Sequence, residues 1–306
     1  MTPDKYTNET LMLDVGDGHQ LSVHDWGNKD AKTPIVYLQG GPGGATSDRK
    51  KLLFDPLAQR VIFYDQRGAG KSLPYGSLEH NTTQDLVADI ITILNSRGIE
   101  RCILVGGSWG STLALCFGIA HPDRVAAMVI DGVWTSTKAE NSWLDQGGFK
   151  TFFPDVWDAY VATVPKANVS NPSAYHFQRI LGNDLETATQ SAIAYTSLEG
   201  GAISLDDRHE PINSDEYDPS ALRIEVHYLN NLCFIPDNYI FDHVGKLTMP
   251  IAMVQGRYDM VCPPHTAYKL SKLLRNAQLH FTTSGHAAEH ESWSLIKLLV
   301  KQFGEA

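Results

Sequence analysis

Short apolar runs alternate with helical periodicity in the first part of the chain. Residues 82–96 place Leu86, Ile90 and Ile93 at helical spacing between two of these runs, which predicts a β-α-β unit. An alternating run at 21–26 is typical of a half-exposed strand. The other runs are too short for helices and predict buried strands of a parallel sheet: 34–38, 61–64, 102–105 and 128–130.

The pattern changes after Trp134. From there to about residue 245, helical periodicity dominates and no clear buried strand is visible. The predicted helices are 154–164, 173–181, 185–198 and 219–232. Strand and helix signals alternate again from Pro250, with apolar runs at 251–254 and 278–281.

This interruption predicts two domains. We expect an α/β core domain, with a mostly parallel central sheet, from residues 1–134 and 246–306. The intervening residues 135–245 are expected to form a helical cap domain.

Composition narrows the classes of function. The 306 residues are 42% hydrophobic, which supports a well-buried core, and the net charge of −10 argues against a nucleic-acid partner. The chain has no apolar stretch of the ~18 residues that would predict a membrane span, and its first residues lack the layout of a signal peptide. Four cysteines without paired spacing predict a reduced, cytoplasmic protein. No metal-ligand cluster stands out, so neither a metal nor a cofactor is expected, and the oligomeric state is open.

The candidate nucleophile is Ser108. Residues 106–110 read Gly-Gly-Ser-Trp-Gly between a predicted strand and a helix-like run, which is the G-x-S-x-G spacing of a nucleophile elbow. A serine on such a sharp turn is lifted out of the sheet, where a histidine can reach it. The alternative is a glycine-rich turn without chemistry.

An acid and a base follow Ser108 in the order that this architecture requires. Asp259 lies just beyond the strand predicted at 251–254, and His286 follows the strand at 278–281 through a polar loop. His290 is a weaker candidate for the base, because it falls on the following helix. Asp131 is the competing acid, because it follows the strand predicted at 128–130.

The oxyanion hole is predicted at two backbone N–H groups. The strand predicted at 34–38 opens into the loop Gln-Gly-Gly-Pro-Gly-Gly at 39–44, from which Gly41 can present its N–H group. Trp109, the residue after the nucleophile, supplies the other. The loop lacks the G-K-[ST] ending of a phosphate-binding loop.

Together these residues resemble the prolyl aminopeptidases (proline iminopeptidases), a branch of the α/β-hydrolase superfamily. The likeness spans most of the chain. The motifs that carry it are Gly-Gly-Pro-Gly-Gly at 40–44, Asp-Gln-Arg-Gly-Ala-Gly-Lys-Ser at 65–72, Gly-Gly-Ser-Trp-Gly-Ser at 106–111, Phe-Phe-Pro-Asp at 152–155, Arg-Ile-Glu at 223–225 with His-Tyr at 227–228, Gly-Arg-Tyr-Asp at 256–259 and Gly-His at 285–286.

The resemblance implies an α/β-hydrolase fold with a helical cap over a Ser-His-Asp site. It also implies release of an N-terminal residue, preferably proline, from short peptides. Ser108, Asp259 and His286 match the triad. Glu225, and less closely Glu199, match cap glutamates that hold the free α-amino group of the substrate.

Several positions depart from the family pattern in the region of the substrate pocket. Trp134 keeps the usual aromatic residue there. The departures are Gln39, Asp131, Leu144, Asp145 and Leu229. Another serine hydrolase, such as an esterase, lactonase or amidase, therefore stays an alternative, as does a binding protein that has kept the fold and lost the chemistry.

Overall fold

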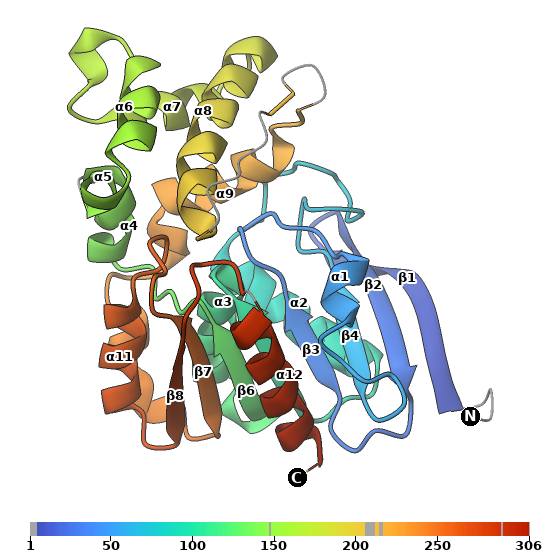
Figure 1. Ribbon diagram of the computed structural model, residues 1–306. Helices are drawn as coiled ribbons and strands as arrows, with labels where there is room; N and C mark the ends of the chain where they lie inside the picture. The colour runs from blue at the N-terminus through green and yellow to red at the C-terminus, as the bar shows by residue number, and fades with distance from the viewer. Residues whose placement is uncertain (1–4, 147, 206–211, 214–216, 289, 306) are drawn as a thin grey trace.

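A single sheet of eight strands forms the centre of the molecule, in the order β1-β2-β4-β3-β5-β6-β7-β8 (Figure 1). The computed structural model describes residues 5–146, 148–205, 212–213, 217–288 and 290–305. Strands β1 and β2, and β2 and β4, pair antiparallel, and every later pairing is parallel. The strands are β1 Tyr6–Gly16, β2 His19–Asn28, β3 Ile35–Leu38, β4 Arg60–Tyr64, β5 Cys102–Gly107, β6 Val125–Asp131, β7 Ile251–Gly256 and β8 Ala277–Thr282.

Seven of these strands lie where the apolar runs predicted them, and the mostly parallel sheet is confirmed. Strand β1 was not predicted, because this edge strand exposes most of its side chains and carries no buried run. The helix at 83–96 connects β4 and β5, which are parallel strands of the one sheet, and β3 lies between them.

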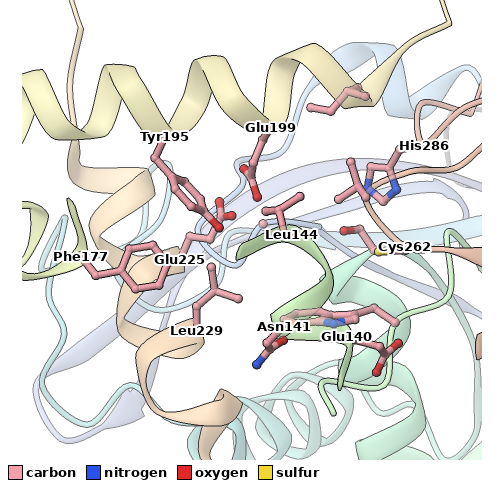
Figure 2. A pocket seen from close by; sticks show the side chains of 15 residues that line it. Glu140, Asn141, Leu144, Phe177, Tyr195, Glu199, Glu225, Leu229, Cys262 and His286 are labelled. Atoms are coloured by element: carbon pink, nitrogen blue, oxygen red, sulfur yellow. The ribbon is translucent and has the colours of Figure 1, made fainter. Parts of the chain in front are cut away.

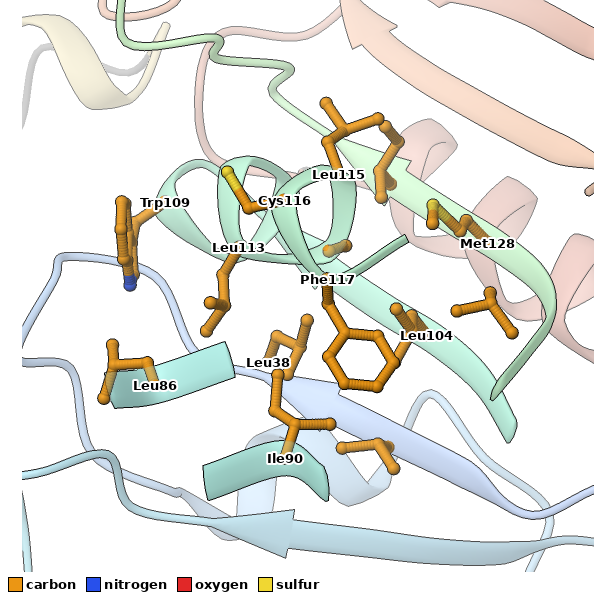
Figure 3. Packing of buried hydrophobic residues seen from close by; sticks show 14 of the residues in the cluster. Leu38, Leu86, Ile90, Leu104, Trp109, Leu113, Leu115, Cys116, Phe117 and Met128 are labelled. Carbon is orange, nitrogen blue, oxygen red and sulfur yellow. The ribbon is translucent and has the colours of Figure 1, made fainter. Parts of the chain in front are cut away.

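Alternate side chains of the strands point to two hydrophobic cores, one on each face of the sheet. Leu38 and Leu104 face one core, which α3 (Trp109–Ala120) covers with Leu113 and Phe117 (Figure 3). Helices α2 (Thr83–Ser96) and α11 (Pro264–Leu273) also pack on this face. The opposite core is covered by α12 (His290–Glu305). Two further helices, α1 (Asp48–Lys51) and α10 (Tyr239–Asp242), are only four residues long.

Helices α2 and α3 differ in how much of their surface is buried. Helix α2 begins with a capping box between Thr82 and Asp85 and buries only one face. Helix α3 is buried along nearly its whole length, as expected of a short helix between a sheet and its neighbours. Among the helices in the described part of the chain, none is both long and apolar enough to cross a membrane.

Six helices, here called the cap helices, gather beyond the carboxyl ends of the parallel strands (Figure 1). They pack around a hydrophobic cluster of their own, which includes Phe149, Tyr195 and Val226. The predicted division into a core and a cap at 135–245 stays a prediction, with which this separate cluster agrees. Helices α4 and α5 were not predicted. The cap helices are α4 Lys138–Gln146, α5 Gly148–Phe152, α6 Pro154–Ala162, α7 Pro172–Ile180, α8 Leu185–Ile203 and α9 Ser220–Asn230.

Candidate active site

Ser108 lies between β5 and α3 in a strained backbone conformation, with φ 56° and ψ −126°. A non-glycine residue rarely adopts a positive φ, and such strain is concentrated at functional sites. The Ser108 N–H donates to the Asp131 carbonyl at 3.0 Å, and the Ser111 hydroxyl donates to the Ser108 carbonyl at 2.7 Å. The turn is therefore held from both sides while its side chain lines a pocket.

The two glycines of the elbow are required by close approach of other backbone. A Cβ atom at Gly110 would collide with the carbonyl oxygen of Leu38 on the neighbouring strand. A Cβ atom at Gly106 would lie 2.9 Å from the carbonyl carbon of Gly110. The G-x-S-x-G spacing thus follows from packing α3 tightly against β3 and β5.

Asp259 and His286 meet in the structure. The two carboxylate oxygens of Asp259 lie 3.1 and 3.0 Å from Nδ1 of His286. Asp259 is fully buried, and its carboxylate accepts hydrogen bonds from the backbone N–H groups of Val261 and Cys262 and from the Gln255 amide. These donors fix the carboxylate in place against the imidazole.

His286 lines the same pocket as Ser108. Burial lowers the imidazole pKa, but the charges of Asp259 and Cys262 and the hydrogen bonds to both side chains together raise the pKa of His286 well above its usual value. The loop that carries His286 is tied to the cap, because the Ala287 N–H donates to the Ile203 carbonyl of α8 at 2.7 Å. The side chain of His290, the weaker candidate, lies outside the described residues.

Asp131 lies close to this pair without forming the contact that Asp259 makes. Burial raises its pKa, whereas Lys50 and His286 lower it. A Cβ atom added at Gly107 would lie 2.7 Å from its carboxylate, so the side chain folds back over β5. The residue is half-buried rather than fully solvated. The geometry favours Asp259 as the partner of His286.

The glycine-rich loop after β3 brings Gly41 to the pocket beside Ser108. The Gln66 amide joins the glycine-rich loop to the side chain of Trp109. Its nitrogen donates to the Gln39 carbonyl at 3.1 Å, and its oxygen accepts from the indole N–H of Trp109 at 2.9 Å. Gln66 was not singled out from the sequence, although it belongs to the motif at 65–72.

The pocket has a volume of about 240 Å³ and lies between the elbow and the cap helices. Figure 2 shows side chains entering it from several of these helices. Leu144 and Leu229, two of the positions that depart from the family pattern, line this pocket. Trp134, which keeps the usual aromatic residue, lines it too. The side chain of Asp145 lies outside the described residues. Phe177 and Tyr195 also line the pocket and were not predicted, because nothing local distinguishes them from the cap cluster.

Glu199 of α8 and Glu225 of α9 meet at the cap side of the pocket (Figure 2). Burial raises the pKa of Glu225 well above its usual value, and the charge of Glu199 and the hydrogen bond to it raise the pKa further. Two carboxyl groups in a hydrogen bond must share a proton. Glu199 and Glu225 therefore hold a shared proton at the cap side of the pocket.

Gln255 is a functional residue that sequence reasoning missed. It is a fully buried polar side chain at the end of the apolar strand β7, and this contrast was the available signal. Its amide donates to Asp259 at 3.0 Å and accepts from the Val133 N–H at 2.8 Å. Gln255 thus fixes the loop that leads to Trp134 against the loop that carries the acid. In the described part of the chain, His, Cys, Asp and Glu side chains form no group that could hold a metal.

Comparison with known proteins agrees with this geometry. Residues 33–291 match the alpha/beta hydrolase fold family. A proline iminopeptidase of Arabidopsis thaliana is 39% identical over 90% of this chain and 74% of its own length. A proline iminopeptidase of Neisseria gonorrhoeae is 35% identical over 90% of this chain and 89% of its own.

Solved structures show the same fold at lower identity. A proline iminopeptidase of Mycobacterium smegmatis superposes with a TM-score of 0.65 at 20% identity, over 97% of this chain and 98% of that one. An esterase of Rhodococcus also gives a TM-score of 0.65, at 18% identity over 99% of each chain. These structural likenesses concern the fold alone.

Proposed function

The chain belongs to the proline iminopeptidase family of α/β hydrolases, and we propose that it releases the N-terminal residue from short peptides through an acyl-enzyme at Ser108. Proline is the residue that the names of its relatives imply. The substrate is a small peptide or aminoacyl compound with a free α-amino group.

The paired glutamates carry this proposal. A substrate ammonium taken into a buried pocket needs a carboxylate partner, because unpaired burial of charge is costly. Glu199 and Glu225 provide two carboxyl groups in the pocket that Ser108 and His286 also line. A pocket of about 240 Å³ between them accommodates one residue rather than a long peptide on the amino side. Holding the N-terminus at this short range selects cleavage after the first residue.

The proposed chemistry needs no group beyond these side chains. His286 removes the proton of the Ser108 hydroxyl while its oxygen attacks the scissile carbonyl. The N–H groups of Gly41 and Trp109 stabilise the oxyanion that forms, and Asp259 stabilises the charged imidazole. His286 then protonates the leaving nitrogen, which breaks the peptide bond. Water, deprotonated by His286, attacks the acyl-enzyme and restores Ser108.

We also infer a reducing, cytoplasmic compartment and no nucleic-acid partner. The first inference is supported by four cysteines that are all free and buried. The second is supported by the net charge of −10.

The deciding experiment compares matched prolyl and alanyl arylamides with free and N-acetylated termini. We expect hydrolysis of the free-amine substrates and a loss of kcat/KM of at least about tenfold on acetylation, because acetylation removes the charge that the glutamates bind. Equal rates on the two forms would contradict the aminopeptidase proposal and favour an esterase or amidase, without affecting the assignment of Ser108.

A further inference from the structure

One polar side chain of the pocket has no role in the proposed chemistry. Asn141, on the first turns of α4, lines the pocket, and both its amide nitrogen and its amide oxygen are buried. Neither atom has a hydrogen-bond partner among the described residues. A buried amide without partners is unfavourable, so its presence needs an explanation.

The neighbouring residue shows that α4 does not need this amide for its own structure. Glu140 caps the start of the helix and accepts hydrogen bonds from the N–H and hydroxyl groups of both Thr135 and Thr137. The Asn141 N–H is satisfied by the Thr137 carbonyl at 3.0 Å. The side-chain amide of Asn141 is therefore available to bind a substrate that enters the pocket.

The proposed function determines how the released residue of the substrate lies in the pocket. The carbonyl of the released residue must lie at Ser108, and its ammonium must lie at Glu199 and Glu225. The side chain of that residue then points to the remaining wall, which includes Asn141, Leu144 and Leu229. In Figure 2 the amide of Asn141 lies on the side of Leu229, and His286 lies on the other side of the pocket.

We propose that Asn141 determines specificity for the side chain of the released residue, and that it favours side chains with a hydroxyl or carboxamide group. This inference rests on the proposed function, because it uses the position of the ammonium. An amide offers a donor and an acceptor together, which a neutral hydroxyl or carboxamide matches. Leu144 and Leu229 beside it are apolar, and the nearby Glu140 carboxylate already accepts hydrogen bonds from Thr135 and Thr137, so a neutral polar group finds its partner in Asn141.

The test uses isosteric pairs of substrates, threonyl against valyl arylamide and asparaginyl against leucyl arylamide. Each pair differs in hydrogen-bonding capacity at nearly constant shape. A pocket built to bond a polar group rejects the analogue that lacks it, because its own polar group stays unpaired. We expect the wild-type protein to prefer the polar member and Asn141→Leu to reverse or abolish that preference, with a change of about 10- to 100-fold in the ratio of kcat/KM.

Two further measurements keep this result interpretable. Lys138→Ala, at an exposed position on the same helix, should leave both ratios unchanged. Asn141→Leu should unfold at the same or a higher Tm, because an apolar side chain of similar size replaces an unpaired buried amide.

Unchanged ratios in Asn141→Leu would overturn the inference, and so would a clear fall in its Tm, which would show that the amide has a structural partner. Both results are distinct from failure of the proposed function. In that case the wild-type protein would hydrolyse N-acetylated and free-amine substrates equally well.

Discussion

The two sides of the pocket are built in different ways. On the sheet side, Ser108, Asp259 and His286 stand on short loops at strand ends, and hydrogen bonds from Gln255, Val261 and Cys262 fix the acid. On the cap side, the lining residues stand on helices that pack around a separate hydrophobic cluster. On the first side three hydrogen bonds hold the acid, whereas the second side presents the hydrogen-bonded carboxyl groups of Glu199 and Glu225 and the amide of Asn141, which has no hydrogen-bond partner among the described residues.

This contrast separates chemistry from recognition. A reaction through an oxyanion needs donors and a base that are already in place, so the sheet side satisfies its own polar groups. Recognition needs polar groups that the substrate completes, and we propose this role for Glu199, Glu225 and Asn141, which line the pocket. Changes on the sheet side should therefore lower kcat on every substrate, and changes on the cap side should alter which substrate is preferred.

The largest effect is expected from Ser108→Ala, which removes the nucleophile. We expect kcat to fall by roughly 10⁴ to 10⁶-fold on all substrates, as for other serine triads, with Tm nearly unchanged. Steady-state kinetics with arylamides, together with thermal unfolding, measures both. Retention of more than about a tenth of the activity would disprove the assignment, because residual triad-independent catalysis is far smaller.

The next effect distinguishes the two acids. Asp259→Asn should lower kcat by about 10⁴-fold, because an amide cannot stabilise the imidazolium and favours the wrong tautomer. Asp131→Asn should change kcat by less than about tenfold, because among the described residues Asp259, and not Asp131, makes the hydrogen bonds to His286. Parallel kinetics of both variants on one substrate decides the question. The opposite ranking would move the acid to the end of β6.

On the cap side, Glu225→Gln should reduce kcat/KM on free-amine arylamides by about 10- to 100-fold, the usual worth of a charge-assisted hydrogen bond. On a small neutral ester the loss should be negligible. That ester is the control within the experiment, because a variant with a damaged triad would lose activity on both substrates.

The carboxyl pair of Glu199 and Glu225 also predicts how KM depends on pH. Because the pKa of Glu225 is raised well above its usual value, Glu199 and Glu225 hold a proton at every pH below that pKa, and a bound ammonium must displace it. KM should therefore fall as the pH rises through that pKa, by up to about tenfold per pH unit. Glu225→Gln should lose this part of the pH profile of KM and keep the part of kcat that His286 determines.

The sheet side could be predicted from the sequence because its signals are local. Two flanking glycines identify Ser108 as the candidate nucleophile. Asp259 and His286 each follow a short apolar run that predicts a strand. The cap side could not, because its lining depends on which helices meet. Asn141 lies on α4, a short and mostly polar helix, and Phe177 resembles any buried aromatic residue of the cap cluster. Gln255 and strand β1 were missed for the related reason that their roles depend on neighbours far along the chain.

The smallest effect concerns Cys262, which lies between the two sides and hydrogen-bonds His286. A thiol is a weak donor, so Cys262→Ala should lower kcat/KM by no more than about threefold. The thiol is only 4% exposed, and burial raises its pKa to about 11, so inactivation by N-ethylmaleimide should be slow at neutral pH.

The rate of that inactivation should rise by about tenfold per pH unit between pH 7 and 9, because only the thiolate reacts. An adduct on Cys262 would fill the pocket beside His286 and exclude substrate, whereas Cys262→Ala should resist the reagent. Inactivation at the same rate in Cys262→Ala would place the reactive thiol elsewhere. A rapid reaction at neutral pH would show that the cap opens to expose Cys262, and the rigid sheet side would then be reached through motion of the other side.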